Sequence, residues 1–202
     1  MTDDRPVAAF DFDGTLTRRD TLVPFLASVA RRSTLLRAAG PVAWDLVRRH
    51  RDAAKEQLLT RVLRGREPAE IVAAGRAYGD HLVSRSIVRG ARERLAWHQR
   101  EGHRVVIVSA SLDVYLQEVA RMLGIDDVIC TELEVDEAGR YTGRMLGGNC
   151  RGVEKARRLR AHLGADTSVL WAYGNGSGDD AMLALAAHPV RVRRGRLREP
   201  AA

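Results

Sequence analysis

Two aspartates, Asp11 and Asp13, follow an apolar stretch in the segment VAAFDFDGTLTRRD, residues 7–20. The residues before them are typical of a buried strand, and the glycine and threonines after them are typical of a turn. Two charged carboxylates this close repel each other when buried, and a divalent cation removes that repulsion. Mg²⁺ binds one or two carboxylates together with phosphate oxygens and water. Taken alone, Asp-x-Asp-Gly is typical of a turn or of part of a calcium loop; together with the other polar clusters described below, it predicts a magnesium-dependent site for a phosphate group.

The two carboxylates can divide the work of phosphoryl transfer. Asp11 is predicted to hold the metal and to act as a nucleophile, because carboxylates form aspartyl-phosphate intermediates. Asp13 is predicted to protonate the leaving alcohol and then to activate water. Hydroxyl, ammonium and backbone N–H donors must stabilise the charge on the phosphoryl oxygens. The residues predicted to bind the phosphate are Ser109, Lys155, Phe12 and Ala110.

The elements that must position these residues alternate between strands and helices. Apolar runs predict strands at 7–10, 104–111, 127–130 and 189–193, another running into the glycine-rich loop 174–179, and a hairpin over 131–145. Helical periodicity separates them, at 90–102, after Ser111, at 152–164 and at 180–187. This alternation predicts an α/β fold, a Rossmann-like three-layer sandwich with a parallel central sheet and right-handed crossovers.

Polar clusters follow three of the predicted strands. They are Asp11 with Asp13, Ser109 with Ser111, and Asn175 with Asp179. Ligands of parallel sheets bind beyond the carboxyl ends of the strands, so these clusters are expected to form one site. Ser111 is also predicted to be the N-cap of the helix that Gly124 ends.

A helical segment separates the first strand from the rest of the α/β pattern. No strand pattern occurs between Thr21 and about Ser86, and Pro41 and Pro68 divide this part into at least three helices. Leu58, Leu59, Val62 and Leu63 share one helical face. We predict a helical cap over residues 18–85, inserted into a core formed by residues 1–17 and 86–202.

Positive charge is concentrated in two places. The net charge is +7; residues 18–85 carry 14 Lys or Arg against 7 acids, the tail from Pro189 carries 5 against 1, and the remainder is at 7 − 7 − 4 = −4. This distribution suits either well-solvated arginines or attraction to anionic substrates and surfaces.

Several protein classes fit this sequence poorly. It has no run of about 18 apolar residues that would span a membrane, and no visible signal peptide. Its two cysteines, Cys130 and Cys150, lack metal-ligand spacing; a disulfide between them is open, and Cys150 is expected to pack near the site. Low cysteine content predicts a cytoplasmic protein. His98 and His103 lack ligand spacing and are expected at the surface.

Four segments together resemble a known family. DFDGTLT, VIVSAS, GVEKARRL and AYGNGSGDDAMLALA are similar to the four sequence blocks of the haloacid dehalogenase superfamily of phosphohydrolases, in its phosphoserine-phosphatase-like branch. The resemblance covers nearly the whole chain. It implies the same roles for Asp11, Asp13, Ser109 and Lys155, a helical cap after the first block, and bound Mg²⁺. The implied metal ligands are Asp11, Asp13, Asn175 and Asp179.

One position departs from the family pattern. The last block usually begins Gly-Asp, whereas this chain has Gly174-Asn175. Asparagine keeps an oxygen ligand but loses a charge. Mg²⁺ binding is still expected, because Asp11, Asp179 and the substrate phosphate supply anionic oxygens.

The substrate is less well defined than the reaction. A small metabolite such as phosphoserine or a related phosphorylated alcohol is the first expectation, with Asp20 and Glu56 as the acids that would recognise its ammonium group. The alternative is a lipid or polyol phosphate at a membrane surface, because the predicted cap mixes Leu, Val and Trp44 with basic residues. A non-catalytic nucleic-acid binder is the third hypothesis; no aromatic interleaving supports it, and no nucleic acid is expected. The oligomeric state stays open.

Overall fold

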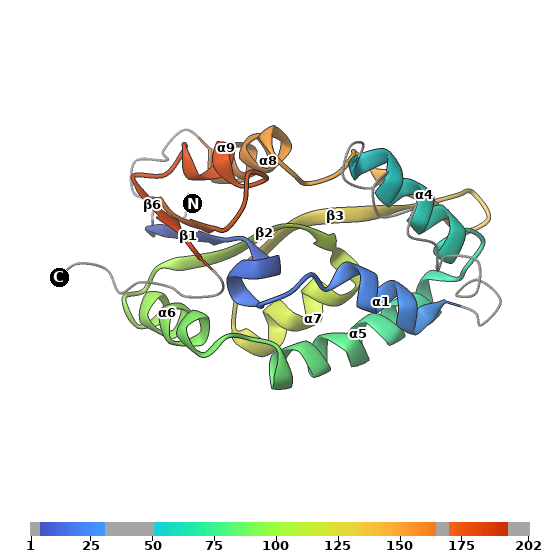
Figure 1. Ribbon diagram of the computed structural model, residues 1–202, viewed down its shortest axis with the longest axis horizontal. Coiled ribbons are helices and arrows are strands. Elements are labelled where there is room, and N and C mark those ends of the chain that lie inside the picture. Colours follow the sequence, from blue (N-terminus) through green and yellow to red (C-terminus); the bar gives the residue numbers. More distant parts are fainter. Residues whose placement is uncertain (1–4, 31–50, 165–169, 194–202) are drawn as a thin grey trace.

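The computed structural model describes residues 5–30, 51–164 and 170–193. These residues form a six-stranded sheet with helices on both faces (Figure 1). The strand order is β4-β3-β2-β1-β5-β6, and every neighbouring pair is parallel except β3 and β4. The predicted α/β sandwich is confirmed. The strands are β1 (Val7–Phe10), β2 (Arg104–Leu112), β3 (Asp127–Val135), β4 (Tyr141–Leu146), β5 (Trp171–Gly174) and β6 (His188–Arg191).

Alternating strand residues supply two separate cores, since successive side chains point to opposite faces of a sheet. Ala8, Phe10 and Val105 pack with α6 (Arg89–Arg100) and α7 (Asp113–Leu123) on one face. Ala9 and Val106 pack with α8 (Val153–Leu163) and α9 (Asp180–Leu183) on the other. Figure 1 shows these two helix pairs on opposite sides of the sheet.

Within residues 18–85, the proposed cap, the described part of the chain forms three helices: α1 (Leu22–Val29), α4 (Arg51–Leu63) and α5 (Pro68–Arg85). Pro68 begins α5, where a missing N–H costs no hydrogen bond. Within α4, Leu59 and Leu63 are fully buried, as the helical pattern predicts. Helix α5 packs along α7, and α4 packs against β4. Pro41 and Trp44 lie outside the described residues, in the segment 31–50.

The chain leaves and rejoins the sheet region at one place. Thr17 and Ile87 form an isolated antiparallel bridge, and Val88 N–H donates to Leu16 O at 2.9 Å. The proposed division into a core (1–17 and 86–202) and a cap (18–85) is compatible with this pairing, because the two ends of the segment lie side by side.

Two local predictions need correction, and the structure also answers the open question of a disulfide. The segments predicted as a strand at 127–130 and as the first arm of the hairpin are one continuous strand, β3. Ser111 is not an N-cap, because it still belongs to β2; α7 begins after Leu112, with no side-chain cap. The thiols of Cys130 and Cys150 are both buried and free, so they form no disulfide.

His98 is fully buried, which corrects its predicted surface position. It lies on the face of α6 that also buries Ala91 and Leu95, the face toward the sheet. Its Nε2 lies 2.8 Å from the Tyr173 hydroxyl, and its Nδ1 lies 2.7 Å from Nδ1 of His103. A neutral imidazole satisfies both contacts, because one ring nitrogen donates and the other accepts.

The burial of His98 makes a measurable prediction about acid stability. Burial, followed by the charges of His103 and Arg94, lowers the pKa of His98 from 6.5 to about 3. Between pH 6.5 and about 3, His98 is protonated in the unfolded chain but not in the folded one. The free energy of unfolding therefore has its full His98 contribution above pH 6.5, and it decreases as the pH is lowered, by up to about 1.4 kcal/mol per pH unit. Urea unfolding of the wild type and of His98→Gln across this range should show a flatter pH dependence in the variant. Parallel curves would contradict a neutral buried His98.

Candidate active site

The carboxyl ends of β2, β1 and β5 are adjacent in the sheet, and the polar clusters that follow them meet there. A cavity of about 330 Å³ opens at this edge. Eight of the ten predicted site residues line it, together with Arg151 and the glycine-rich loop after β5. The predicted residues lining the cavity are Asp11, Asp13, Asp20, Ser109, Ala110, Lys155, Asn175 and Asp179.

Asp11 lies at the base of this cavity, with only 6% of its surface exposed. Its backbone N–H donates to Tyr173 O at 2.9 Å, which extends the pairing of β1 with β5 by one residue. Lys155 Nζ donates to Asp11 Oδ1 at 2.6 Å and to Asp179 Oδ1 at 2.5 Å, and Thr15 Oγ1 donates to Asp11 Oδ2 at 2.9 Å. A single ammonium thus lies between two buried carboxylates.

The charges in this cluster do not balance. Burial opposes the charged form of Lys155, but the charges of Asp11 and Asp179 outweigh it and raise the lysine pKa. Burial raises the pKa of Asp11, and the charge of Asp179 adds to it, although Lys155 acts in the opposite direction. When both carboxylates are ionised they carry one negative charge more than the lysine neutralises, so a bound cation would stabilise their charged forms.

Asp13 is held by donors on both of its oxygens. Thr21 donates to Oδ1 from its backbone N–H (2.9 Å) and its hydroxyl (2.8 Å), and Ser111 Oγ donates to Oδ2 at 2.5 Å. Burial, followed by the charge of Asp20, raises the pKa of Asp13 to about 7 despite these donors. Near neutral pH this carboxyl therefore exists in both forms, as a residue that first gives and then takes a proton requires.

The loop after β5 is tied to the turn after β1. Backbone N–H groups of Asn175 and Gly176 donate to Asp179 Oδ2, and Asn175 Nδ2 donates to Asp13 O at 3.0 Å. Gly14 makes this approach possible: its φ is +82°, and a Cβ there would lie 1.7 Å from Asn175 Nδ2. A residue larger than glycine would displace the Asn175 amide.

The oxygen donors of the cavity suit Mg²⁺. Among the described residues no three His, Cys, Asp or Glu side chains are grouped as a metal site. The candidate ligands are instead two carboxylates (Asp11, Asp179), the Asn175 amide oxygen and the Asp13 carbonyl. Hard oxygens with only two carboxylates fit Mg²⁺, which retains waters and phosphate oxygens, better than Zn²⁺, which prefers Cys and His.

Ser109 is presented toward the cavity by its neighbour. It is 1% exposed, and its Oγ accepts a hydrogen bond from Ser111 N–H at 3.0 Å. Because the oxygen is already an acceptor, its own proton remains available to a ligand.

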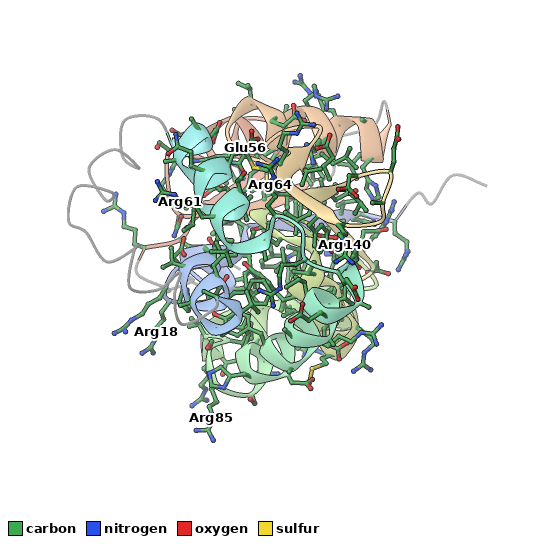
Figure 2. All side chains as sticks on the ribbon, turned by 90° about the vertical axis from the view of Figure 1, so that its right-hand side faces the viewer. Arg18, Glu56, Arg61, Arg64, Arg85 and Arg140 are labelled. Atoms are coloured by element: carbon green, nitrogen blue, oxygen red, sulfur yellow. The ribbon has the colours of Figure 1, made fainter. Side chains whose placement is uncertain are left out.

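Two predicted residues stand apart from the cavity lining. Phe12 buries its side chain in the core, and Glu56 lies on α4 (Figure 2).

Sequence reasoning overlooked two residues of this site, Thr21 and Arg151. It placed Ser111 in the expected polar cluster but gave it the role of a helix cap, although Ser109 and Ser111 are two apart at a strand end and therefore share a face. Thr21 bonds to Asp13 across a turn that no periodicity predicts. Arg151 lines the cavity from the loop before α8, where nothing distinguishes it from the other arginines of the chain.

Comparison with known proteins agrees with this fold. Residues 8–184 match the family model of haloacid dehalogenase-like hydrolases, and the chain belongs to that family. It is 34% identical to protein CicA of Caulobacter vibrioides, over 94% of this chain and 87% of CicA. It is 28% identical to phosphoserine phosphatase SerB1 of Mycobacterium tuberculosis, over 92% of this chain and 64% of that protein.

A solved structure shares the fold. The phospho-aspartyl intermediate analogue of phosphoserine phosphatase superposes with a TM-score of 0.60, at 19% identity, over 91% of this chain and 84% of that one. The protein is therefore a hydrolase of the haloacid dehalogenase family, and the resemblance to its phosphoserine-phosphatase-like branch is confirmed.

Proposed function

We propose that the protein is a Mg²⁺-dependent phosphomonoester hydrolase that works through an aspartyl-phosphate on Asp11. One observation carries the proposal: Asp11, Asp13, Ser109 and Lys155 line a single cavity at the carboxyl ends of neighbouring strands. The solved phosphoserine phosphatase that shares the fold was captured as an analogue of such an intermediate.

The residues divide the reaction into two steps. A carboxylate oxygen of Asp11 attacks phosphorus, the bond from phosphorus to the substrate oxygen breaks, and Asp13 gives that oxygen its proton. Asp13 then takes a proton from water, which attacks the phosphoryl group and frees Asp11 and inorganic phosphate. The Ser109 hydroxyl and the Lys155 ammonium donate to the phosphoryl oxygens in both steps. Phe12 and Ala110 add backbone N–H groups to this set.

The proposed Mg²⁺ ligands are Asp11, Asp179, Asn175 and, through its carbonyl, Asp13. When bound, the metal neutralises the charge of the phosphoryl oxygens and of the acids around them. The excess negative charge at Asp11 and Asp179 supports this assignment. Asn175 contributes an uncharged oxygen, so the carboxylates supply all the protein's negative charge to the metal.

The proposed substrate is a small phosphorylated alcohol that also carries an ammonium group and a carboxylate, and phosphoserine is an example. The cavity of about 330 Å³ is the size of a small-molecule site. Asp20 and Arg151 line it besides the reacting groups, and they offer one carboxylate and one guanidinium. The name of SerB1 supports the same substrate class. The predicted role of Glu56 in recognition finds no support, since it does not line the cavity.

A lipid or polyol phosphate is the second candidate. Arg18, Arg61, Arg64 and Arg85 are exposed (Figure 2), and exposed arginines favour contact with an anionic surface. None of the described helices is both long and apolar enough to cross a bilayer, so the proposal is a peripheral contact. A cytoplasmic location is also proposed, from the low cysteine content of the sequence.

Purified protein should hydrolyse p-nitrophenyl phosphate with Mg²⁺, and EDTA should reduce the rate by about 10²-fold or more, because the excess negative charge would repel the substrate. Restoring Mg²⁺ should restore the rate. A panel of phosphoserine, glycerol phosphate and lysophosphatidate then ranks the substrates by kcat/KM.

The variant Arg151→Gln tests whether this arginine recognises the carboxylate of the substrate. It should weaken phosphoserine hydrolysis by about 10-fold while leaving p-nitrophenyl phosphate, which has no carboxylate, nearly unchanged. Equal rates with and without Mg²⁺ would contradict the metal assignment. Preference for lysophosphatidate would favour the second candidate.

A further inference from the structure

Lys55 is a buried cation that the reaction as described does not use. It lies in α4, within the proposed cap, and only 9% of its surface is exposed. Its Nζ donates to Ala110 O at 2.5 Å, to Asn149 Oδ1 at 2.7 Å and to Thr131 Oγ1 at 3.2 Å. All three ammonium protons are therefore used, each on a different segment of the core.

These contacts form a network that joins α4 to the loop before α8. Asn149 Nδ2 donates back to Asp52 Oδ1 on α4 at 2.6 Å, and Thr131 Oγ1 donates to Asn149 Oδ1 at 3.0 Å. Thr131 Oγ1 also accepts the backbone N–H of Cys150 at 3.1 Å. The loop held in this way leads directly into the helix that carries Lys155.

The acceptor on β2 gives Lys55 a path to the reacting groups. Ala110 O and Ser111 N belong to the same peptide unit, and that N–H donates to Ser109 Oγ at 3.0 Å. A cation on the carbonyl polarises the peptide and strengthens the bond that its N–H makes. That bond leaves the Ser109 proton for a phosphate, while the Ser111 hydroxyl holds Asp13.

The composition of the chain sets Lys55 apart from its other cations. Of 33 basic residues only two are lysines, Lys55 and Lys155, and both are buried at or beside the cavity. An ammonium is a compact group with three donors, whereas a guanidinium is a wide planar fork that would not fit three converging acceptors.

We propose that Lys55 is a positioning residue: it fixes the Ala110–Ser111 peptide from α4, and so orients the Ser109 hydroxyl toward the phosphoryl group. This inference rests on the proposed function. It makes phosphate binding depend on the docking of the cap helix, although none of the side chains described for α4 lines the cavity.

The test compares Lys55→Met and Lys55→Arg, each alone and combined with Ser109→Ala. Both single variants should lose about 10- to 100-fold in kcat/KM for p-nitrophenyl phosphate, the scale of a misplaced reacting group. In the Ser109→Ala background the same changes should cost less than about 3-fold, because a residue that acts through Ser109 has nothing left to orient. Titration calorimetry with inorganic phosphate should show the same non-additivity.

The control is Arg61→Met, which removes an exposed cation from the same helix (Figure 2) and should change neither rate nor phosphate affinity. Retained activity in Lys55→Arg would show that the charge alone matters. Costs that add to those of Ser109→Ala would show that Lys55 does not act through Ser109. Either result would overturn the proposal. If Lys55→Met does not fold, Lys55→Gln, whose amide keeps two N–H donors without the charge, enters the same cycle. Wild-type protein that binds phosphate without hydrolysing p-nitrophenyl phosphate would remove the proposed function but leave the Lys55 binding test intact.

Discussion

Replacing Asp11 by Asn should lower phosphatase activity by about 10³-fold or more, the scale on which loss of a covalent nucleophile acts. The amide has the shape of the carboxylate but cannot attack phosphorus. The variant should fold at least as well as the wild type, because burial and Asp179 already disfavour a charge at Asp11. Steady-state rates with p-nitrophenyl phosphate and thermal unfolding measure the two effects.

Asp80→Asn is the matched control for this experiment. Asp80 lies exposed on α5, outside the cavity lining, so the same change there should leave the rate within about 2-fold. Inorganic phosphate should still bind to the Asp11→Asn variant, through Ser109 and Lys155. A variant that retains a tenth or more of the activity would show that Asp11 is not the nucleophile.

Replacing Gly75 by Ala should destabilise the protein by roughly 1–3 kcal/mol, as overpacking does in closely packed interiors. Gly75 lies where α5 crosses α7, and a Cβ there would approach Val114 O to 2.1 Å. The obstacle is backbone, so one helix must move. Urea unfolding followed by circular dichroism gives the change in the free energy of unfolding.

Gly90→Ala separates the clash from the ordinary effect of the substitution. Gly90 is also helical, in α6, but a Cβ there meets nothing within 4 Å. Alanine stabilises helices by up to about 1 kcal/mol relative to glycine, so this variant should be neutral or more stable. A Gly75→Ala variant that gains stability as Gly90→Ala does would show that the two helices are not packed this closely.

Much of the fold could be predicted because its signals are local. Apolar runs and helical periodicity located β1, β2, α6 and α8 within a residue or two. His98 was misplaced because its polar type outweighed its position on the inward face of α6. Ser111 was misread because a serine before a helix also matches the pattern of a cap, and only tertiary structure shows that β2 continues through it.

The site divides in the same way. Asp11, Asp13, Ser109 and Asp179 could be predicted because each lies near or just beyond the carboxyl end of a strand, and these strand ends meet at one edge of a parallel sheet. Lys55 could not, because its partners are a carbonyl, a threonine and an asparagine from distant segments, and none of these leaves a trace in the sequence around it. Glu56 was predicted to recognise the substrate because of its charge, but it is the neighbouring Lys55 that contacts the core.

The strand order also bears on how the folded chain avoids aggregation. Exposed edge strands can recruit strands from other molecules, and short edges, prolines and covering helices prevent this. Over the described residues one outer strand, β4, has α4 packed against it, and the other, β6, has four residues and contains Pro189, which donates no backbone hydrogen bond. Helix α4 therefore has a second role besides carrying Lys55: it shields the hairpin edge from intermolecular β-pairing.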